Sequence, residues 1–250
     1  MRHAPFIASL LGFALSFSHI TRVDAAELKV LAGGSMTVSL KELGPRFEKA
    51  TGHKLDVTYA ATPELIKMAN SAPFDLGVVP VDVMKDAGAR GKFAGAPINV
   101  ARVGYGVAVR AGALKPDVST PEALKTTLLK AQSITFIPSS AAGAYVIKVF
   151  DRLGIADAMK AKTRPQTATA AIAEAVAKGD AELGVFLTNV LSAPGVELAG
   201  PLPGELQSEL VFVGAIAAES KNAEAAKALL DYLKTPEAAA VFKAKGVTPG

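Results

Sequence analysis

The sequence predicts an α/β fold in two lobes, with parallel-rich sheets that carry helices on both faces. Three observations lead to this prediction. The chain has 250 residues, 50% of them hydrophobic and 20% charged, which is enough for two lobes with cores of their own. Stretches typical of strands alternate with stretches typical of helices. Two long extended stretches are placed so that they can carry the chain from one lobe to the other and back.

Residues 1–25 are expected to be a secretory signal peptide. Arg2 and His3 precede an apolar run from Phe6 to Phe17, and small residues stand at the expected cleavage site after Ala25. The run is interrupted too early to cross a bilayer, which needs about 20 apolar residues. Removal takes away two basic residues and one acidic residue, so the net charge falls from +4 to +3. That charge is too small to indicate nucleic-acid binding, and we expect an exported protein.

The first half of the mature chain predicts a β-α-β-α-β series. Leu28 to Leu31 is a short apolar strand, and the loop from Ala32 to Ser35 follows it. Apolar residues then recur at steps of four and three in a helix that ends at Gly52. A strand at Leu55–Tyr59, a helix at about Pro63–Asn70 and a strand at Leu76–Val79 complete the series. Short connections of this kind favour parallel strands with right-handed crossovers.

A long extended stretch, Ile98 to Arg110, leads into a second series with the same architecture. Thr120 and Pro121 begin its first helix as N-cap and first helical residue. A strand is expected at Ile134–Ile137 and a helix at about Gly143–Leu153. An alanine-rich helix that ends at Lys178 and a strand at Leu183–Leu187 are expected to follow. The segment Pro194 to Gly204, rich in proline and glycine, is expected to be a turn-rich connection.

The extended stretch Leu210 to Ala217 is expected to return the chain, and two helices at Ala223–Leu233 and Pro236–Lys245 close it. The predicted organisation is therefore a first lobe of residues 26–103 and 209–250 and a second lobe of residues 104–208. The hinge crossings lie near Val103–Val109 and Leu210–Val213. A ligand would lie between the lobes at the carboxyl ends of the strands, where helix N-termini also point.

Four strand-to-helix loops end in small or hydroxylic residues: Gly33–Ser35, Ala60–Thr62, Ser139–Ala142 and Thr167–Thr169. Small side chains expose the first N–H groups of a helix, which carry partial positive charge and bind anions. Serine and threonine hydroxyls add hydrogen-bond donors at the same places. One such loop alone is more often an ordinary helix cap, but four of them in the two halves favour an anion-binding cleft.

The sequence offers little for catalysis or for metal binding. It has no cysteine, which excludes disulfides, cysteine-ligated metals and thiol nucleophiles. The mature chain has one histidine, His53, in a turn where a solvated side chain is expected. Asp75 and Asp82 flank a strand and are interpreted as loop-end caps, and Tyr105 and Tyr145 as core or hinge aromatics. We therefore expect no cofactor, no metal and no enzymatic activity, with an exported enzyme of unrecognised type as a remote alternative.

The order of motifs resembles the periplasmic molybdate-binding proteins of ABC importers, which are type II solute-binding proteins. The motifs are the signal peptide, VLAGGSM, FEKATGHKLDVTY, SAPFDLGVV and the C-terminal PEAAAVFKAKG, and the resemblance covers Ala26 to Gly250. It is strongest for a branch whose ligand is not established, which also has sequences similar to VRAGALKPDVSTPEALK and PGVELAGPLPGELQ. The resemblance implies a periplasmic monomer with the two-lobe periplasmic binding protein fold. It also implies that the protein delivers a small anion to an inner-membrane ABC permease.

In that family the anion is held by neutral donors from both lobes. The resemblance assigns ligand binding to Ser35, Thr62, Ala142, Thr169 and Leu187. Further candidates beside them are Gly34, Ala61, Ser140, Arg164 and Thr188. Leu187 departs from the pattern, because the family has a tyrosine there and a phenolic donor is therefore lost. The adjacent Thr188 or Asn189 is a candidate to replace it, but a strand turns neighbouring side chains to opposite faces.

Two ligand classes remain open. A tetrahedral oxyanion such as molybdate or tungstate fits Ser35, Thr62 and two amide donors, and it is the preferred class. A small organic carboxylate fits the same donors, with Leu187 against its carbon skeleton. An organic acid usually requires a fork-shaped cation, for which Arg164 is the candidate, although a solvated loop arginine is the commoner situation. The expected function is therefore that of a solute-binding component that captures a small oxyanion between its lobes.

Overall fold

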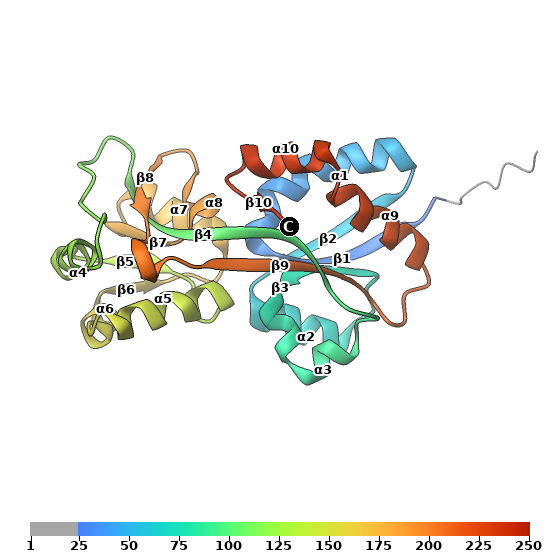
Figure 1. Cartoon of the computed structure of the whole chain (residues 1–250), viewed down its shortest axis with the longest axis horizontal. Coiled ribbons are helices and arrows are strands. Elements are labelled where there is room, and N and C mark those ends of the chain that lie inside the picture. Colours follow the sequence, from blue (N-terminus) through green and yellow to red (C-terminus); the bar gives the residue numbers. More distant parts are fainter. Residues whose placement is uncertain (1–24) are drawn as a thin grey trace, which may run out of the picture.

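The computed structural model describes residues 25–250 and shows two lobes that lie side by side along the longest axis (Figure 1). The predicted signal peptide, except for Ala25, lies outside the described residues. One mixed sheet of ten strands runs through both lobes in the order β2-β1-β3-β9-β4-β7-β5-β6, with β8 and β10 paired to β4. The predicted α/β class and two-lobe fold are confirmed.

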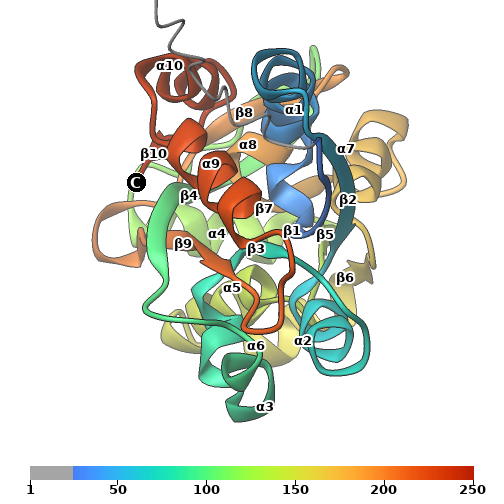
Figure 2. The same cartoon turned by 90° about the vertical axis from the view of Figure 1, so that its right-hand side faces the viewer.

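The first lobe is built on parallel strands. β1 (Glu27–Gly33) pairs in parallel with β2 (Lys54–Ala60) and with β3 (Leu76–Pro80), as the short connections predicted. Helices cover both faces of this part of the sheet, with α1, α9 and α10 on one side and α2 and α3 on the other (Figure 2). Their bounds are Thr37–Thr51 (α1), Thr62–Ser71 (α2), Ala87–Gly91 (α3), Ala223–Leu233 (α9) and Pro236–Ala244 (α10).

The helices of the first lobe follow their sequence patterns. α1 buries Leu43 and Phe47 in the core and ends at Gly52, whose φ is 79°. Glycine is favoured there because it has no Cβ to clash in a left-handed backbone. Thr235 begins α10 as the predicted N-cap, since its Oγ1 accepts a hydrogen bond from Ala238 N at 3.2 Å. Local signals thus fix where these helices begin and end.

The second lobe repeats the alternation of strands and helices. Its strands are β5 (Ile134–Phe136), β6 (Thr163–Pro165), β7 (Leu183–Leu187) and β8 (Val196–Pro201). β5 pairs in parallel with both β6 and β7, and β7 and β8 pair antiparallel with β4. Its helices are α4 (Pro121–Lys130), α5 (Ala141–Arg152), α6 (Ala156–Lys162), α7 (Thr169–Lys178) and the short α8 (Thr188–Leu191). The predicted cap Thr120 accepts a hydrogen bond from Ala123 N at 3.1 Å.

Some elements of the second lobe differ from the prediction. The segment Pro194 to Gly204, expected to be a turn-rich connection, contains strand β8. Its proline is tolerated because Pro201 is the last residue of a strand that pairs along one edge, with β4. β6 and α6 were not predicted, since three and seven residues are too few for a periodic pattern to emerge.

The strands β4 (Ile98–Arg110) and β9 (Glu209–Ile216) connect the lobes and run side by side in both views (Figures 1 and 2). β4 pairs with β9 over residues 98–104 and with β7 and β8 over residues 105–110. At the change of partner, Tyr105 N donates to Gln207 Oε1 at 3.0 Å, and Gln207 Nε2 donates to Tyr105 O at 2.9 Å. The Gln207 amide thus takes the place of a peptide group just before β9 begins.

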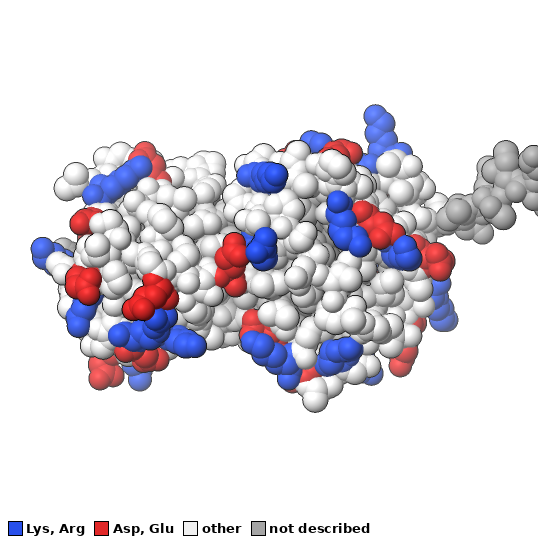
Figure 3. Space-filling view, viewed as in Figure 1, with Lys and Arg blue, Asp and Glu red and all other residues white. Residues whose placement is uncertain are grey.

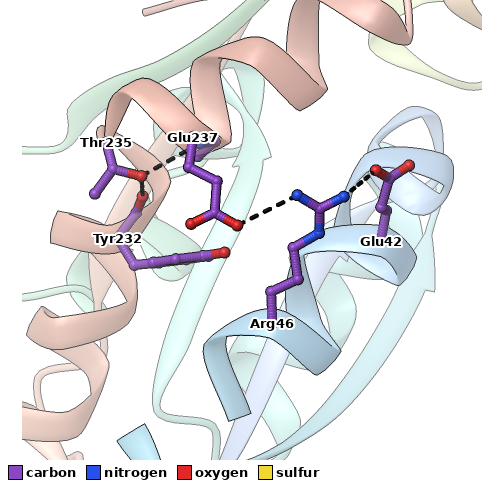
Figure 4. A network of polar contacts seen from close by, with 6 residues as sticks. Glu42, Arg46, Tyr232, Thr235 and Glu237 are labelled. Carbon is purple, nitrogen blue, oxygen red and sulfur yellow. Dashed lines mark hydrogen bonds and ion pairs between the residues drawn. The ribbon is translucent and has the colours of Figure 1, made fainter. Parts of the chain in front are cut away.

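Ion pairs fasten the first lobe's α1 to its C-terminal helix α10. Arg46 of α1 lies between Glu42, at 2.7 Å, and Glu237 of α10, at 3.2 Å (Figure 4). The phenol of Tyr232 points toward the Glu237 carboxylate, and Lys245 pairs with Glu42 at 2.8 Å. The charged groups are partly exposed, so each pair contributes modestly to stability. A short last strand, β10 (Thr248–Pro249), then pairs with β4.

Two buried polar side chains hold the chain near its start. His53 was expected to be solvated, but it is only 4% exposed, and its Nδ1 accepts a hydrogen bond from Ala26 N at 3.1 Å. The ring also stacks on Phe47, which explains its burial. Asp75 accepts hydrogen bonds from Lys29 N at 2.9 Å and Ser220 Oγ at 2.6 Å. Asp75 therefore joins three segments of the first lobe, in agreement with a structural role.

On the face shown in Figure 3, basic and acidic side chains are interspersed over both lobes. No extended patch of one sign is visible there, which agrees with the small net charge. Within residues 25–250, no helix combines the length and the apolar character that a membrane span requires.

Candidate ligand-binding site

A cavity of about 240 Å³ lies between the lobes. Strand ends and helix starts of both lobes surround it, so the four predicted loops meet in space. Seven of the predicted site residues line it: Gly34, Ser35, Ala61, Thr62, Ser140, Ala142 and Thr169.

Three predicted residues do not line the cavity. Leu187 is completely buried, and its neighbour Phe186 faces the cavity instead. Adjacent strand residues point to opposite faces, so a strand that presents Phe186 turns Leu187 away. Arg164 lies in β6 with an exposed side chain, and Thr188 begins α8 outside the cavity lining. The fork-shaped cation expected for an organic acid is therefore not supplied by Arg164.

Ser35 has a hydroxyl that is free for a ligand. It belongs to a short 3-10 turn, η1 (Gly34–Met36), which leads from β1 into α1. The residue is 8% exposed and lines the cavity, and its hydroxyl makes no hydrogen bond with any of residues 25–250. Because the residue lines the cavity and the protein does not use its hydroxyl, the hydroxyl can donate to a ligand there. Ser35 is thus the predicted donor that the structure places best.

Three hydrogen bonds join the lobes around the cavity, and we call them the interlobe clasp. Ala141 N donates to Thr62 Oγ1 at 3.0 Å, and Thr169 Oγ1 donates to Gly34 O at 3.2 Å. Asn189 Nδ2 donates to Ser35 O at 2.7 Å, and this hydrogen bond is the shortest of the three. Of the two residues considered as replacements at Leu187, Asn189 therefore reaches the other lobe. It contacts the backbone behind Ser35 and does not line the cavity.

Helix starts supply main-chain donors from both lobes. Thr62 begins α2, Ala142 is in the first turn of α5, and Thr169 begins α7, and all three residues line the cavity. The first N–H groups of a helix have no partner within the helix and carry partial positive charge. Ser140, in contrast, is occupied as a cap, because its hydroxyl donates to Ile137 O and accepts from Gly143 N. Its side chain is therefore not free for a ligand.

The rest of the cavity wall is apolar. Pro80, Phe186, Leu210 and Phe212 line it, and none of them was predicted from the sequence. Among residues 25–250, no lysine, arginine, aspartate, glutamate or histidine lines the cavity. Its one ionisable side chain is that of Tyr59, and burial raises the pKa of this phenol above the usual value. In the described residues no acidic or histidine cluster is suited to hold a metal ion.

Two lobes joined by a pair of crossing strands, with a cavity of uncharged donors between them, define a two-lobe solute-binding protein. Comparison with known families agrees. The chain belongs to the bacterial extracellular solute-binding protein family, whose model matches residues 28–248.

Two relatives of this chain carry names of different function. Aconitate isomerase of a Pseudomonas species is 34% identical over 231 residues, covering 89% of this chain and 87% of the relative. The molybdate-binding protein ModA of Azotobacter vinelandii is 29% identical over 230 residues, covering 89% and 90%.

Solved structures show the same fold. The periplasmic molybdate-binding protein of A. vinelandii has a TM-score of 0.75 at 20% identity, over 89% of this chain and 99% of that structure. The tungstate-binding protein TupA of Desulfovibrio alaskensis has a TM-score of 0.64 at 14% identity, over 90% and 99%.

One expectation from the sequence is contradicted by these comparisons. We expected no enzymatic activity, yet a relative that matches most of the chain is named as an isomerase. The expectation rested on the shortage of histidine, cysteine and paired carboxylates. That shortage excludes particular mechanisms, but it does not exclude catalysis on this fold.

Proposed function

We propose that the protein is the solute-binding component of an ABC importer and that it captures a small anion in the interlobe cavity. The observation that carries the proposal is the set of donors around the cavity. The starts of α2, α5 and α7 and the unpartnered Ser35 hydroxyl meet at a cavity that, among residues 25–250, no charged side chain lines. Such donors bind an anion without bringing a counter-charge that would have to be desolvated as well.

The first candidate ligand is a tetrahedral oxyanion such as molybdate or tungstate. Each of its oxygens accepts hydrogen bonds, and the donors come from both lobes. Relatives named for molybdate binding support this candidate. We also propose that the predicted signal peptide exports the protein and that the mature form is a periplasmic monomer that docks on an inner-membrane permease. The proposed lobes are residues 26–103 with 209–250, and residues 104–208.

A small organic carboxylate is the second candidate, and a separate observation favours it. Phe186, Leu210 and Phe212 give the cavity an apolar wall, which suits a carbon skeleton better than it suits an oxygen atom. The volume of about 240 Å³ also holds more than the five heavy atoms of a tetrahedral oxyanion. A relative that is named for its action on aconitate supports an acid of this kind.

Calorimetric titration of the mature protein with molybdate, tungstate, sulfate and a series of small di- and tricarboxylates tests the proposal. We expect one anion per chain, and each organic acid that binds is also checked for isomerisation after incubation. Binding of a sugar or a metal cation, with none of these anions bound, would overturn the proposal.

Ser35→Ala is the matched variant. We expect a tenfold to hundredfold loss of affinity, or about 1.5 to 3 kcal/mol, because the change removes a donor to a charged group. The thermal unfolding of the free protein should change little, since the hydroxyl has no protein partner. Ser71→Ala is the control, because Ser71 Oγ donates to Lys67 O on the exposed side of α2. A loss of stability with unchanged affinity would remove Ser35 from the site.

A further inference from the structure

A phenol from the first lobe, that of Tyr59, lines the cavity, and no sequence motif predicted a role for it. Tyr59 is the penultimate residue of β2, directly before the loop that leads to Thr62. Leu55, Val57 and Tyr59 alternate with exposed residues and are half-buried on one face of this edge strand. Leu55, Val57 and Tyr59 all pack against the core, and Tyr59, near the end of the strand, also lines the cavity.

The hydroxyl of Tyr59 has no hydrogen-bond partner in the described part of the chain, and burial alone raises its pKa. Three of the six other hydroxyls of the cavity wall donate to groups within the protein. Thr37 and Thr169 both donate to Gly34 O, at 2.6 and 3.2 Å, and Ser140 caps α5. Besides Tyr59, donor hydrogens remain at Ser35 and Thr62 and at Thr167, which is exposed. Few side-chain donors are therefore left to a ligand.

Among the described residues that line the cavity, none from the opposite lobe is a tyrosine. β7 presents Phe186 to the cavity and buries Leu187, so its aromatic ring there carries no donor. An anion held only by helix starts and by Ser35 would face this apolar wall with unanswered lone pairs, each costly in a dry site. A phenolic O–H placed on the first lobe answers one of them.

We propose that Tyr59 is a ligand-binding residue whose hydroxyl donates a hydrogen bond to the bound anion. This inference rests on the proposed function, because it assumes that the cavity holds an anion. Tyr59 then works together with Ser35 from the same lobe, while the starts of α5 and α7 donate from the other lobe. The ring of Tyr59 also contributes an apolar edge, so the residue selects for ligand shape as well as for charge.

The protonation state of the phenol is consistent with this role. Burial disfavours the phenolate and raises the pKa of Tyr59 above the ordinary value for tyrosine. A bound anion raises it further, because two negative charges repel. The hydroxyl therefore stays protonated and able to donate at neutral pH.

Tyr59→Phe tests the inference, because it removes the hydroxyl and keeps the ring. We measure the affinity for molybdate, and for whichever carboxylate binds best, by calorimetry, together with thermal unfolding of the free protein. We expect about a tenfold loss of affinity and almost unchanged unfolding. Tyr145→Phe is the matched control, since its hydroxyl donates to Leu206 O at 3.0 Å and the residue does not line the cavity. That variant should lose some stability and keep its affinity.

Tyrosine fluorescence gives a second readout. The chain has four tyrosines and no tryptophan, so the emission on ligand binding reports on tyrosine alone. A ligand-induced change present in the wild type and in Tyr145→Phe, but lost in Tyr59→Phe, supports the contact. Wild-type affinity in Tyr59→Phe, combined with weakened binding in Ser35→Ala, overturns the role of Tyr59 and leaves the proposed function intact. Failure of the wild type to bind any anion of the series overturns both.

Discussion

Asn189 is predicted to hold the lobes closed, and its effect can be worked out from the structure. Its Nδ2 donates to Ser35 O at 2.7 Å across the lobes, and the side chain is 9% exposed. A neutral hydrogen bond contributes about 0.5 to 1.5 kcal/mol net. The Oδ1 of the same amide is buried and has no partner among the described residues, which offsets part of that gain. We therefore assign about 1 kcal/mol to the contact.

Asn189→Ala should lower ligand affinity about fivefold, because closure is linked to binding and 1.4 kcal/mol corresponds to a factor of ten. Asn189→Asp should lose more than tenfold, since a carboxylate oxygen would then oppose the Ser35 carbonyl. Dissociation rates measured by stopped flow should rise in step with these losses. We expect the free protein to open at the hinge crossings, so that the bond joins the lobes only in the loaded form and the melting temperature of the free protein stays the same.

Ser192→Ala is the control for Asn189. Ser192 follows the same short helix, and its hydroxyl donates to Thr188 O within the second lobe. Its removal should leave the dissociation rate unchanged. If both Asn189 variants release ligand at the wild-type rate, or if they lose stability and not affinity, the assignment of a closing role to this residue is refuted.

Three further substitutions test the fold. Gly143→Ala would place a Cβ 1.8 Å from Ile137 O. We expect this variant to fail in soluble expression or to lose several kcal/mol of stability, and a wild-type melting curve would contradict the close approach. Gln207→Leu removes both hydrogen bonds to the Tyr105 backbone and should cost about 2 kcal/mol in denaturant unfolding, whereas no loss would mean that the amide is not needed at the crossing. Arg46→Ala should cost less than about 1 kcal/mol, because both of its ion pairs are partly exposed, and a larger loss in the same assay would show that α10 depends on them.

Much of the fold could be predicted because its signals are local. Thr120, Thr235 and Gly52 mark helix ends by side-chain caps and backbone conformation, which depend on a few neighbouring residues. β8 could not be predicted, because its proline and glycine content is typical of turns and only pairing with β4 makes it a strand. The buried position of His53 depends on Ala26 and Phe47, which approach it through the folded sheet.

Part of the candidate site could also be predicted from the sequence. Ser35, Thr62, Ala142 and Thr169 reach the cavity because each begins a helix after a strand, and such ends gather at one edge of a sheet. Phe186 was missed in favour of Leu187, because which strand residue faces the cavity depends on register, and a shift of one position exchanges the two faces. The sequence around Tyr59 is that of an ordinary half-buried strand. The contact of Asn189 depends on how closely the lobes approach, which no local pattern encodes.

The uncharged lining of the cavity has a consequence for how ligand affinity depends on pH. An extracellular solute-binding protein meets the pH of its surroundings, and carboxylates or histidines in a site would gain or lose charge between about pH 4 and 7. Here the ionisable lining group is a phenol whose pKa burial has raised, so the cavity presents the same donors throughout that interval. Any change of affinity with pH in that interval then follows the titration of the bound solute itself. A weak organic acid and a fully ionised oxyanion should therefore give different profiles with the same protein.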